Sequence, residues 1–172
     1  FIERMLDDED DGSHQPADDA EHDLEPMQFL SYVPLQKAGE GTFSRVLKAQ
    51  HLHTGRYVAI KCMKSPFPSL EKVNRLREIQ ALKKLSPHPN IVKLLEVLYD
   101  PENGKLALVM ELMERNIYEW IRGRKTYISE QRIKSWLWMM LKGIDHMHQN
   151  GIFHRVCNVA VIHCRYSIEL NG

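Results

Sequence analysis

Five strand-like segments, with one helix-like segment inserted after the third, constrain the fold of this 172-residue chain more than any other feature. The apolar runs that favour strands occupy residues 32–38, 45–51, 57–63, 91–98 and 106–112. Turn signals that contain glycine lie between several of these runs, at Gly39–Ser44, Thr54-Gly55 and Asp100–Gly104. The order predicts an α+β fold, in which a five-stranded antiparallel sheet with one helix leads into a mainly helical region.

Two segments show the apolar periodicity of amphipathic helices. Ser69 is a candidate N-cap for the first, which ends before Ser86-Pro87 and carries an apolar residue at every third position: Val73, Leu76, Ile79, Leu82 and Leu85. Ser129 is expected to cap the second, which runs to about Gln149 with the apolar residues Ile133, Trp136, Leu137, Trp138, Met140, Leu141, Ile144 and Met147. A short helix is expected at 117–121. An apolar stripe as wide as that of the second helix is normally buried against other elements.

The formal net charge of zero conceals an acidic N-terminal segment. Residues 1–26 carry eleven acidic side chains and one basic side chain, Arg4, and the remaining residues sum to +10. So few apolar residues cannot bury enough surface to offset the entropy of ordering the segment. We therefore expect 1–26 to be a disordered leader, with an acidic docking arm as the alternative. Patterned structure begins after Met27, which is a candidate internal start in a chain that opens on Phe1.

The three cysteines, Cys62, Cys157 and Cys164, form no CxxC pair, which favours free thiols in a reducing compartment. A zinc site made of His154, Cys157, His163 and Cys164 is a weaker alternative, because this spacing fits no common finger. No metal ligand is therefore assigned. No apolar run reaches membrane-spanning length, and no secretory leader is visible, so we expect a soluble intracellular protein with no membrane or nucleic-acid partner.

The turn Gly39-Glu-Gly41-Thr-Phe-Ser44-Arg-Val46 has the form GxGxx(G/S)xV. Glycine lets a backbone approach phosphate oxygens closely and direct N–H groups at them. Taken alone, the turn also fits an ordinary hairpin, because hairpins favour glycine as well.

Lys61 makes the phosphate-binding interpretation stronger. It is a charged residue inside the apolar strand at 57–63, and such a lysine must either reach solvent or find an anion. The candidate anions are nucleotide phosphates and Glu78, which lies on the following helix. The alternative places Lys61 on an edge strand and Glu78 on a solvated helix face.

The chain resembles eukaryotic protein Ser/Thr kinases of the CMGC group from about Tyr32 to Arg155. Seven sequence islands in the family's order carry this resemblance: Gly-Glu-Gly-Thr-Phe-Ser (39–44), Leu-Arg-Glu-Ile-Gln-Ala-Leu (76–82), Pro-His-Pro-Asn-Ile (87–91), Glu-Leu-Met (111–113), Asn-Ile-Tyr-Glu (116–119), Ile-Arg-Gly-Arg (121–124) and Asn-Gly-Ile-Phe-His-Arg (150–155). The resemblance implies a kinase small lobe at 27–113 and the start of a helical large lobe at 114–155. A divergent and unstructured tail is expected at 156–172.

The resemblance also implies the residues that hold ATP. They are Gly39, Glu40, Gly41, Thr42, Phe43, Ser44, Val46, Ala59, Lys61, Met110, Glu111 and Met113. The glycine turn would cover the phosphates, Val46 and Ala59 would sandwich the adenine, and Met110 would stand at the back of the pocket. The backbone of Glu111 and Met113 would contact adenine at the hinge. Lys61 would clamp the phosphates and pair with Glu78, which makes these two the expected catalytic residues.

The catalytic groups that the family places after His154-Arg155 are replaced in this chain. Val156 stands where the catalytic Asp is expected, Asn158 where a Lys is expected and Val161 where a metal-binding Asn is expected. An Asp-Phe-Gly segment is also absent from the sequence, so the Mg²⁺ ligands of the family are missing. Because valine can neither accept a proton nor bind Mg²⁺, we expect no phosphoryl transfer by this chain.

The sequence therefore predicts a protein Ser/Thr kinase by family that keeps its ATP-binding lobe, is truncated inside the catalytic loop and is inactive as written. The alternative is a non-catalytic, pseudokinase-like scaffold. Codons for Val156-Cys157-Asn158 can resemble a 5′ splice site, which suggests a tail read from an intron. Expected partners are ATP, protein substrates or kinase partners, and chaperones that capture an exposed apolar patch on the helix at 129–149. The expected location is the cytoplasm, with the nucleus and cilium as further locations by family resemblance.

Overall fold

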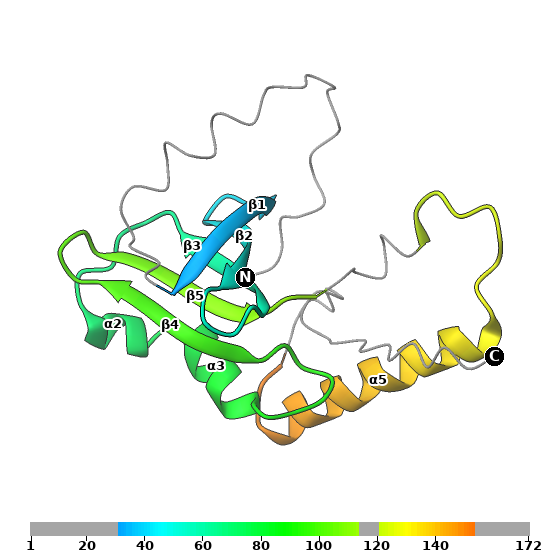
Figure 1. Ribbon diagram of the computed structural model, residues 1–172. Helices are drawn as coiled ribbons and strands as arrows, with labels where there is room; N and C mark the ends of the chain where they lie inside the picture. The colour runs from blue at the N-terminus through cyan, green and yellow to red at the C-terminus, as the bar shows by residue number, and fades with distance from the viewer. Residues whose placement is uncertain (1–30, 114–120, 154–172) are drawn as a thin grey trace. The chain divides into compact units, whose positions relative to one another are not determined.

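A computed structural model of the chain describes residues 31–113 and 121–153 and divides them into two compact units. The sheet unit contains residues 31–76 and 94–112, and the helical unit contains 77–93, 113 and 121–153. Figure 1 shows the five strands of the first unit and the helices α3 and α5 of the second. The expected acidic leader, residues 117–120 of the expected short helix and the tail from residue 154 onward lie outside the described residues.

The sheet unit is built on five antiparallel strands. They are β1 (Tyr32–Glu40), β2 (Ser44–His51), β3 (Tyr57–Met63), β4 (Leu94–Asp100) and β5 (Lys105–Glu111). Their order across the sheet is β1-β2-β3-β5-β4, and every neighbouring pair is antiparallel. This confirms the expected α+β class with its five-stranded sheet. The apolar strand β3 has the bounds that the sequence predicts and occupies the centre of the sheet (Figure 1).

The turns lie where the glycine signals place them. Gly55 has a φ of +67°, and its N–H donates to the His51 carbonyl at 2.8 Å in the turn between β2 and β3. Between β4 and β5, a carboxylate oxygen of Asp100 accepts the N–H groups of Glu102 and Asn103, and Gly104 has a φ of +65°. A side chain that accepts backbone N–H groups two and three residues on is a common way to build such a turn.

The helix expected to run from Ser69 to Leu85 is two helices, α2 (Leu70–Asn74) and α3 (Arg77–Leu85). The Ser69 hydroxyl accepts the Lys72 N–H at 3.3 Å, which confirms the expected cap. After α2, the Leu76 N–H donates to the Val73 carbonyl at 3.0 Å, a tighter turn than an α-helix makes. Apolar residues every third position would wind steadily around one straight helix, which has 3.6 residues per turn. The break allows Val73 and Ile79 to be buried on separate helices.

Strand β4 also differs from the expectation, because it begins at Leu94 rather than at Ile91. Ile91 and Val92 are buried, but Ile91 belongs to the helical unit, where it packs with Leu85 of α3 and Met147. Apolar content alone does not distinguish a strand residue from a residue that fills the core of another unit. The predicted strand therefore began three residues too early.

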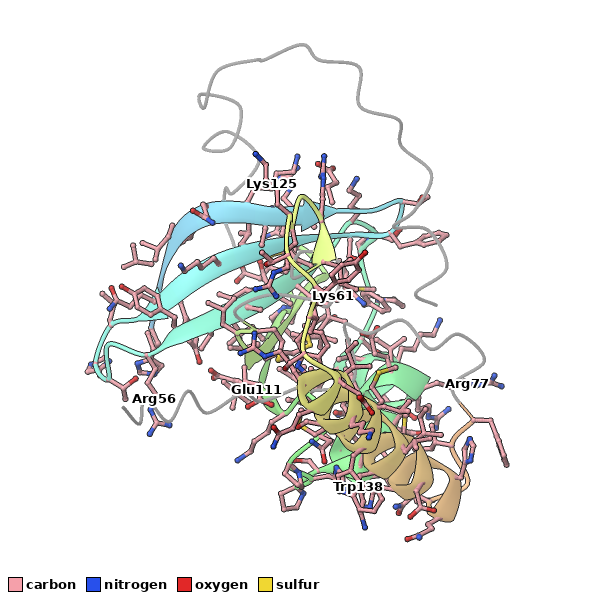
Figure 2. The ribbon with its side chains drawn as sticks, turned by 90° about the vertical axis from the view of Figure 1, so that its right-hand side faces the viewer. Arg56, Lys61, Arg77, Glu111, Lys125 and Trp138 are labelled. Atoms are coloured by element: carbon pink, nitrogen blue, oxygen red, sulfur yellow. The ribbon has the colours of Figure 1, made fainter. Side chains whose placement is uncertain are left out.

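Helix α5 (Glu130–Gln149) begins after Ser129 as expected, but the Ser129 side chain makes no capping hydrogen bond. Its C-terminal half is packed inside the helical unit, because Met147, Met140 and Ile144 contact Leu85 and Ile91. Four apolar side chains of α5 are half-exposed or more, namely Ile133, Leu137, Trp138 and Leu141. Figure 2 shows Trp138 projecting from the helix. The exposed apolar patch expected on this helix is thus present. None of the described helices is long and apolar enough to cross a membrane.

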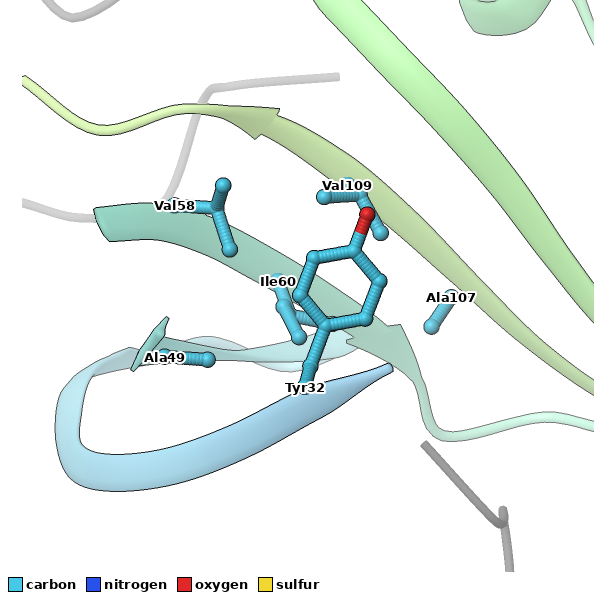
Figure 3. Packing of buried hydrophobic residues seen from close by; sticks show 6 residues of the cluster. All are labelled: Tyr32, Ala49, Val58, Ile60, Ala107 and Val109. Atoms are coloured by element: carbon cyan, nitrogen blue, oxygen red, sulfur yellow. The ribbon is translucent and has the colours of Figure 1, made fainter. Parts of the chain in front are cut away.

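One face of the sheet carries the core of the sheet unit. The residues that form it are Tyr32, Ala49, Val58, Ile60, Ala107 and Val109, and each is at most 7% exposed. Figure 3 shows the Tyr32 ring over Ile60, with Val58 and Val109 beside it. The cluster draws on β1, β2, β3 and β5, so it fixes the relative positions of the strands that carry the expected site.

Replacing Tyr32 by Phe is expected to lower the free energy of unfolding by about 1 kcal/mol, because the buried phenol loses one hydrogen bond. The Tyr32 hydroxyl donates to Glu96 Oε2 at 2.7 Å, and burial together with this bond raises the pKa of Tyr32 to about 12. A raised phenol pKa contributes stability that is complete below pH 10 and is lost as the pH rises toward 12. Urea unfolding at several pH values measures this. If Tyr32→Phe and the parent chain lost equal unfolding free energy as the pH rises toward 12, the assignment of this loss to Tyr32 would be contradicted.

Candidate functional site

Four of the residues expected to hold a nucleotide lie on one face of the sheet. Val46 of β2 stands directly opposite Lys61 of β3, and Ala59 of β3 stands opposite Met110 of β5. Residues directly opposite in an antiparallel pair project from the same face, and so do residues two apart on one strand. Val46, Ala59, Lys61 and Met110 are therefore neighbours on a common surface, with Leu108 opposite Lys61.

This surface is the reverse of the core face. Along β3 the residues alternate, so that Val58 and Ile60 are buried in the core while Ala59 and Lys61 are half-buried on the other side. Val46 and Met110 are half-buried as well. A lysine set among apolar side chains that keep some access to solvent can meet an anion attached to an apolar ring. Figure 2 labels Lys61 within the sheet.

The glycine turn joins β1 to β2 beside this surface. Gly39 and Glu40 are the last residues of β1, Gly41 to Phe43 form the turn, and Ser44 begins β2. The Gly41 N–H donates to the Ser44 carbonyl at 2.8 Å, which closes the turn. A Cβ added at Gly41 would meet only the Ser44 carbonyl oxygen, at 3.9 Å. Protein packing therefore does not require glycine at position 41, and the open space beside its backbone is available to a ligand.

Glu40 is held by two lysines at the end of the glycine turn. Its carboxylate pairs with Lys37 on the same strand and with Lys64 Nζ at 2.6 Å. Hydrogen bonds from Lys37 and then from Lys64 lower the pKa of Glu40 to about 2. Glu40 is therefore ionised throughout the physiological range.

Lys64 contacts the turn a second time through its backbone. Its N–H donates to the Phe43 carbonyl at 3.0 Å, so the residue that follows β3 touches both ends of the turn. Neither Lys37 nor Lys64 is among the site residues expected from the sequence. Lys37 lies three residues before Glu40, which is a short-range signal, but the contact with Lys64 depends on how three strands align and has no counterpart in sequence spacing.

Cys62 is the only cysteine among the residues that the structure describes, and it is not a reactive one. It packs against the core cluster, and burial raises the pKa of its thiol to about 11, although Arg45, which stands opposite on β2, acts in the other direction. A thiol that stays protonated is a poor nucleophile. The site therefore offers no covalent chemistry through Cys62.

Not all of the expected site residues lie in the sheet unit. Glu111 ends β5, opposite Val58, and belongs to the sheet unit, whereas Met113 and Glu78 belong to the helical unit. The pairing of Lys61 with Glu78 and the hinge contact of Met113 stay predictions. His154, Arg155 and the replaced catalytic positions lie outside the described residues, as do three residues of the alternative zinc site, Cys157, His163 and Cys164. Within 31–113 and 121–153, no cluster of three or more His, Cys, Asp or Glu could hold a metal ion.

Comparison with known proteins places the site in a family context. The model of the protein kinase domain matches residues 32–156. The MAPK/MAK/MRK overlapping kinases of Mus musculus and Homo sapiens are 55% and 54% identical over 125 residues, which is 73% of this chain. A probable serine/threonine-protein kinase of Dictyostelium discoideum is 42% identical over 132 residues, 77% of this chain. The chain spans 30% of the length of the first two relatives and 24% of the third.

These matches confirm the resemblance to CMGC Ser/Thr kinases. The same seven islands also indicate, more narrowly, a likeness to the MAPK/MAK/MRK-overlapping kinase, known too as MOK or the RAGE kinase, and the two mammalian relatives confirm it. The matched segment begins at Tyr32, where β1 begins, and ends at Val156. It therefore contains the whole sheet and both described helices of the helical unit.

Proposed function

The chain belongs to the protein kinase domain family, and we propose that its sheet unit binds ATP without transferring the phosphate. The observation that carries the proposal is the common face of Val46, Ala59, Lys61 and Met110, placed beside the glycine turn and backed by the buried core. An apolar surface that includes the ammonium group of Lys61 and adjoins a glycine turn matches the two halves of a nucleotide.

The residues present fit ATP in their chemistry. Gly41 leaves space beside its backbone for a phosphate group, because only the Ser44 carbonyl lies near the position of a Cβ. Lys61 supplies positive charge on the half-buried face. Val46, Ala59 and Met110 would exclude water around the adenine, and the backbone of Glu111 at the end of β5 would bind its edge. ATP supplies the γ-phosphoryl group that protein kinases transfer, usually with Mg²⁺.

Phosphoryl transfer is not part of the proposed function of this chain, because of the residues after Arg155. Val156, Asn158 and Val161 occupy the positions where the family carries a catalytic Asp, a Lys and a metal-binding Asn. None of the three can accept the substrate proton or hold Mg²⁺ as a carboxylate does. Where an Asp follows His-Arg in a longer product of the same gene, we propose ATP-dependent phosphorylation of protein serine and threonine.

Lys61→Met is expected to abolish the stabilisation of the protein by ATP. A ligand at one hundred times its Kd stabilises a protein by about 2.7 kcal/mol, which raises the melting temperature by several degrees. Lys48→Met is the matched control, because Lys48 stands opposite Ala59 on the same face but interacts with the Tyr57 ring. It should keep most of the response. Differential scanning fluorimetry with ATP, with and without Mg²⁺, measures the shift.

The outcomes of this experiment separate specific from general binding. Equal melting-temperature shifts in Lys61→Met and Lys48→Met would mean that ATP binding depends only on the net charge of the protein. A parent chain that does not respond to ATP would overturn the proposed function. A phosphotransfer assay with a generic protein substrate should show no activity in any of the three proteins, and activity in the parent would contradict the inference from Val156.

The alternative function is a non-catalytic binding module that associates with partner kinases or chaperones. The observation that favours it is the exposed apolar side of α5, which carries Ile133, Leu137, Trp138 and Leu141. Size-exclusion chromatography with light scattering distinguishes the two functions when it is combined with the ATP response. A monomer that responds to ATP supports nucleotide binding, and an associating chain that ignores ATP supports the module.

A further inference from the structure

The ion pair between Glu40 and Lys64 connects two strands that are not neighbours. Glu40 is the last residue of β1, and Lys64 directly follows β3, whereas the sheet order places β2 between these strands. The contact therefore crosses the tip of the hairpin that β1 and β2 form. It closes over the segment where Gly41, Thr42 and Phe43 lie.

Two independent contacts of Lys64 meet the two ends of this segment. The ammonium group reaches Glu40 Oε1 at 2.6 Å, just before the turn, and the backbone N–H reaches the Phe43 carbonyl at 3.0 Å, the last residue of the turn. The backbone bond holds Phe43, whose side chain is 67% exposed and gives little packing of its own. A short turn that is fixed at both ends loses little further entropy when a ligand binds to it.

The ion pair contributes little to the stability of the folded chain. The side chains of Glu40 and Lys64 are 33% and 41% exposed, and ion pairs so accessible to solvent contribute little to the folded state. Lys37 can also neutralise the same carboxylate without any connection to β3. A role in placing the turn explains the arrangement better than a role in holding the sheet together.

We propose that Glu40 and Lys64 are positioning residues that hold the glycine turn in the conformation that receives the phosphates of ATP. This inference rests on the proposed nucleotide binding. It assigns Glu40 an indirect role, because a carboxylate that faced the phosphates itself would repel them. Lys64 acts with it as the second half of the link.

The direction in which one substitution changes ATP affinity distinguishes this role from simple electrostatics. Glu40→Gln removes a negative charge near the turn, and charge alone would then make ATP bind more tightly. Loss of the link predicts the opposite, because the released turn must be ordered again when ATP binds. We expect Glu40→Gln to raise the Kd of ATP roughly three- to tenfold, because a short turn must then be ordered when ATP binds. Adenosine, which has no phosphates, should bind equally to both proteins.

The experiment measures the Kd of ATP and of adenosine by isothermal titration calorimetry for the parent chain, Glu40→Gln, Lys64→Met and the double variant. Lys64→Met should weaken ATP binding like Glu40→Gln, and the double variant should lose little more than either single variant. Lys37→Met is the matched control. It removes one positive charge beside the Glu40 carboxylate, as Lys64→Met does, but it leaves the link to β3 intact. Its ATP affinity should stay close to that of the parent.

Each outcome decides a separate question. A parent chain that binds no ATP overturns the proposed function, and the positioning role with it. A parent chain that binds ATP, combined with equal or tighter binding by Glu40→Gln, overturns the positioning role alone. Equal losses in Lys37→Met and Lys64→Met would assign the effect to charge and would overturn it as well. Melting temperatures measured without ligand confirm that each variant is folded.

Discussion

Replacing Gly104 by Ala should destabilise the sheet unit by about 3 kcal/mol, the sum of a positive-φ strain and an overpacked contact. Gly104 has a φ of +65°, a conformation that side chains with a Cβ rarely adopt. A Cβ at this position would lie 2.7 Å from the Phe67 carbonyl oxygen, closer than such atoms can approach. An alanine at position 104 would therefore have both a strained backbone and a steric clash.

The segment that would have to move is tied down. The Phe67 N–H donates to the Gly104 carbonyl at 2.7 Å, and the Phe67 carbonyl accepts the Tyr99 hydroxyl at 2.9 Å. A shift of Phe67 that makes room for the Cβ would weaken both bonds. This is why the clash is expected to cost free energy rather than to be relieved by a small displacement.

Gly55→Ala is the matched control for this prediction. Gly55 has a φ of +67°, but a Cβ there would meet only Gln50 Nε2 at 3.7 Å, an ordinary contact. We expect a loss of about 1 kcal/mol from the backbone conformation alone. Urea unfolding followed by circular dichroism measures both variants. Equal losses in Gly104→Ala and Gly55→Ala would show that the contact with Phe67 contributes nothing.

Ile60→Ala is expected to lower the free energy of unfolding by about 2–5 kcal/mol, the range for large buried aliphatic residues that are truncated. Ile60 is fully buried at the centre of the core cluster, beneath the Tyr32 ring (Figure 3). Its neighbours belong to β1, β2 and β5, so little can move into the space that the side chain leaves. A domain of this size has a total stability of only about 5–15 kcal/mol, so the variant loses a large share of it.

Leu52→Ala provides the comparison, because Leu52 is 57% exposed in the turn after β2. Its loss should stay within about 0.5 kcal/mol. The midpoint of urea unfolding reports both changes, and an unchanged slope confirms that the same surface is exposed on unfolding. An Ile60→Ala variant as stable as Leu52→Ala would contradict the assignment of this face as the core. The nucleotide would then have no rigid surface behind its site.

The sheet was predictable because its signals are local. The apolar run from Tyr57 to Met63 has the observed bounds, and Gly55 and Gly104 mark turns that need positive φ. Because side chains alternate along a strand, Ala59 and Lys61 had to share a face. The resemblance placed Val46 and Met110 beside them, and the observed register brings all four together.

The features that sequence reasoning missed depend on contacts between distant segments. The break between α2 and α3 was hidden by a continuous apolar series, because Leu76 within that series lies in the turn between the two helices. Ile91 reads as a strand residue but fills the core of the helical unit. The link from Lys64 to Glu40 requires three strands to be in register before the two charges meet. No local pattern contains such information.

The order of the strands has a consequence for the chain during its synthesis. Strand β3 lies between β2 and β5, but 41 residues separate its last residue, Met63, from the first residue of β5, Lys105. While the ribosome is still adding this interval, one edge of β3 has backbone N–H and C=O groups without their later partner. An apolar strand with an open edge pairs readily with other chains. The arrival of β5 therefore closes this edge of β3 to pairing with other chains.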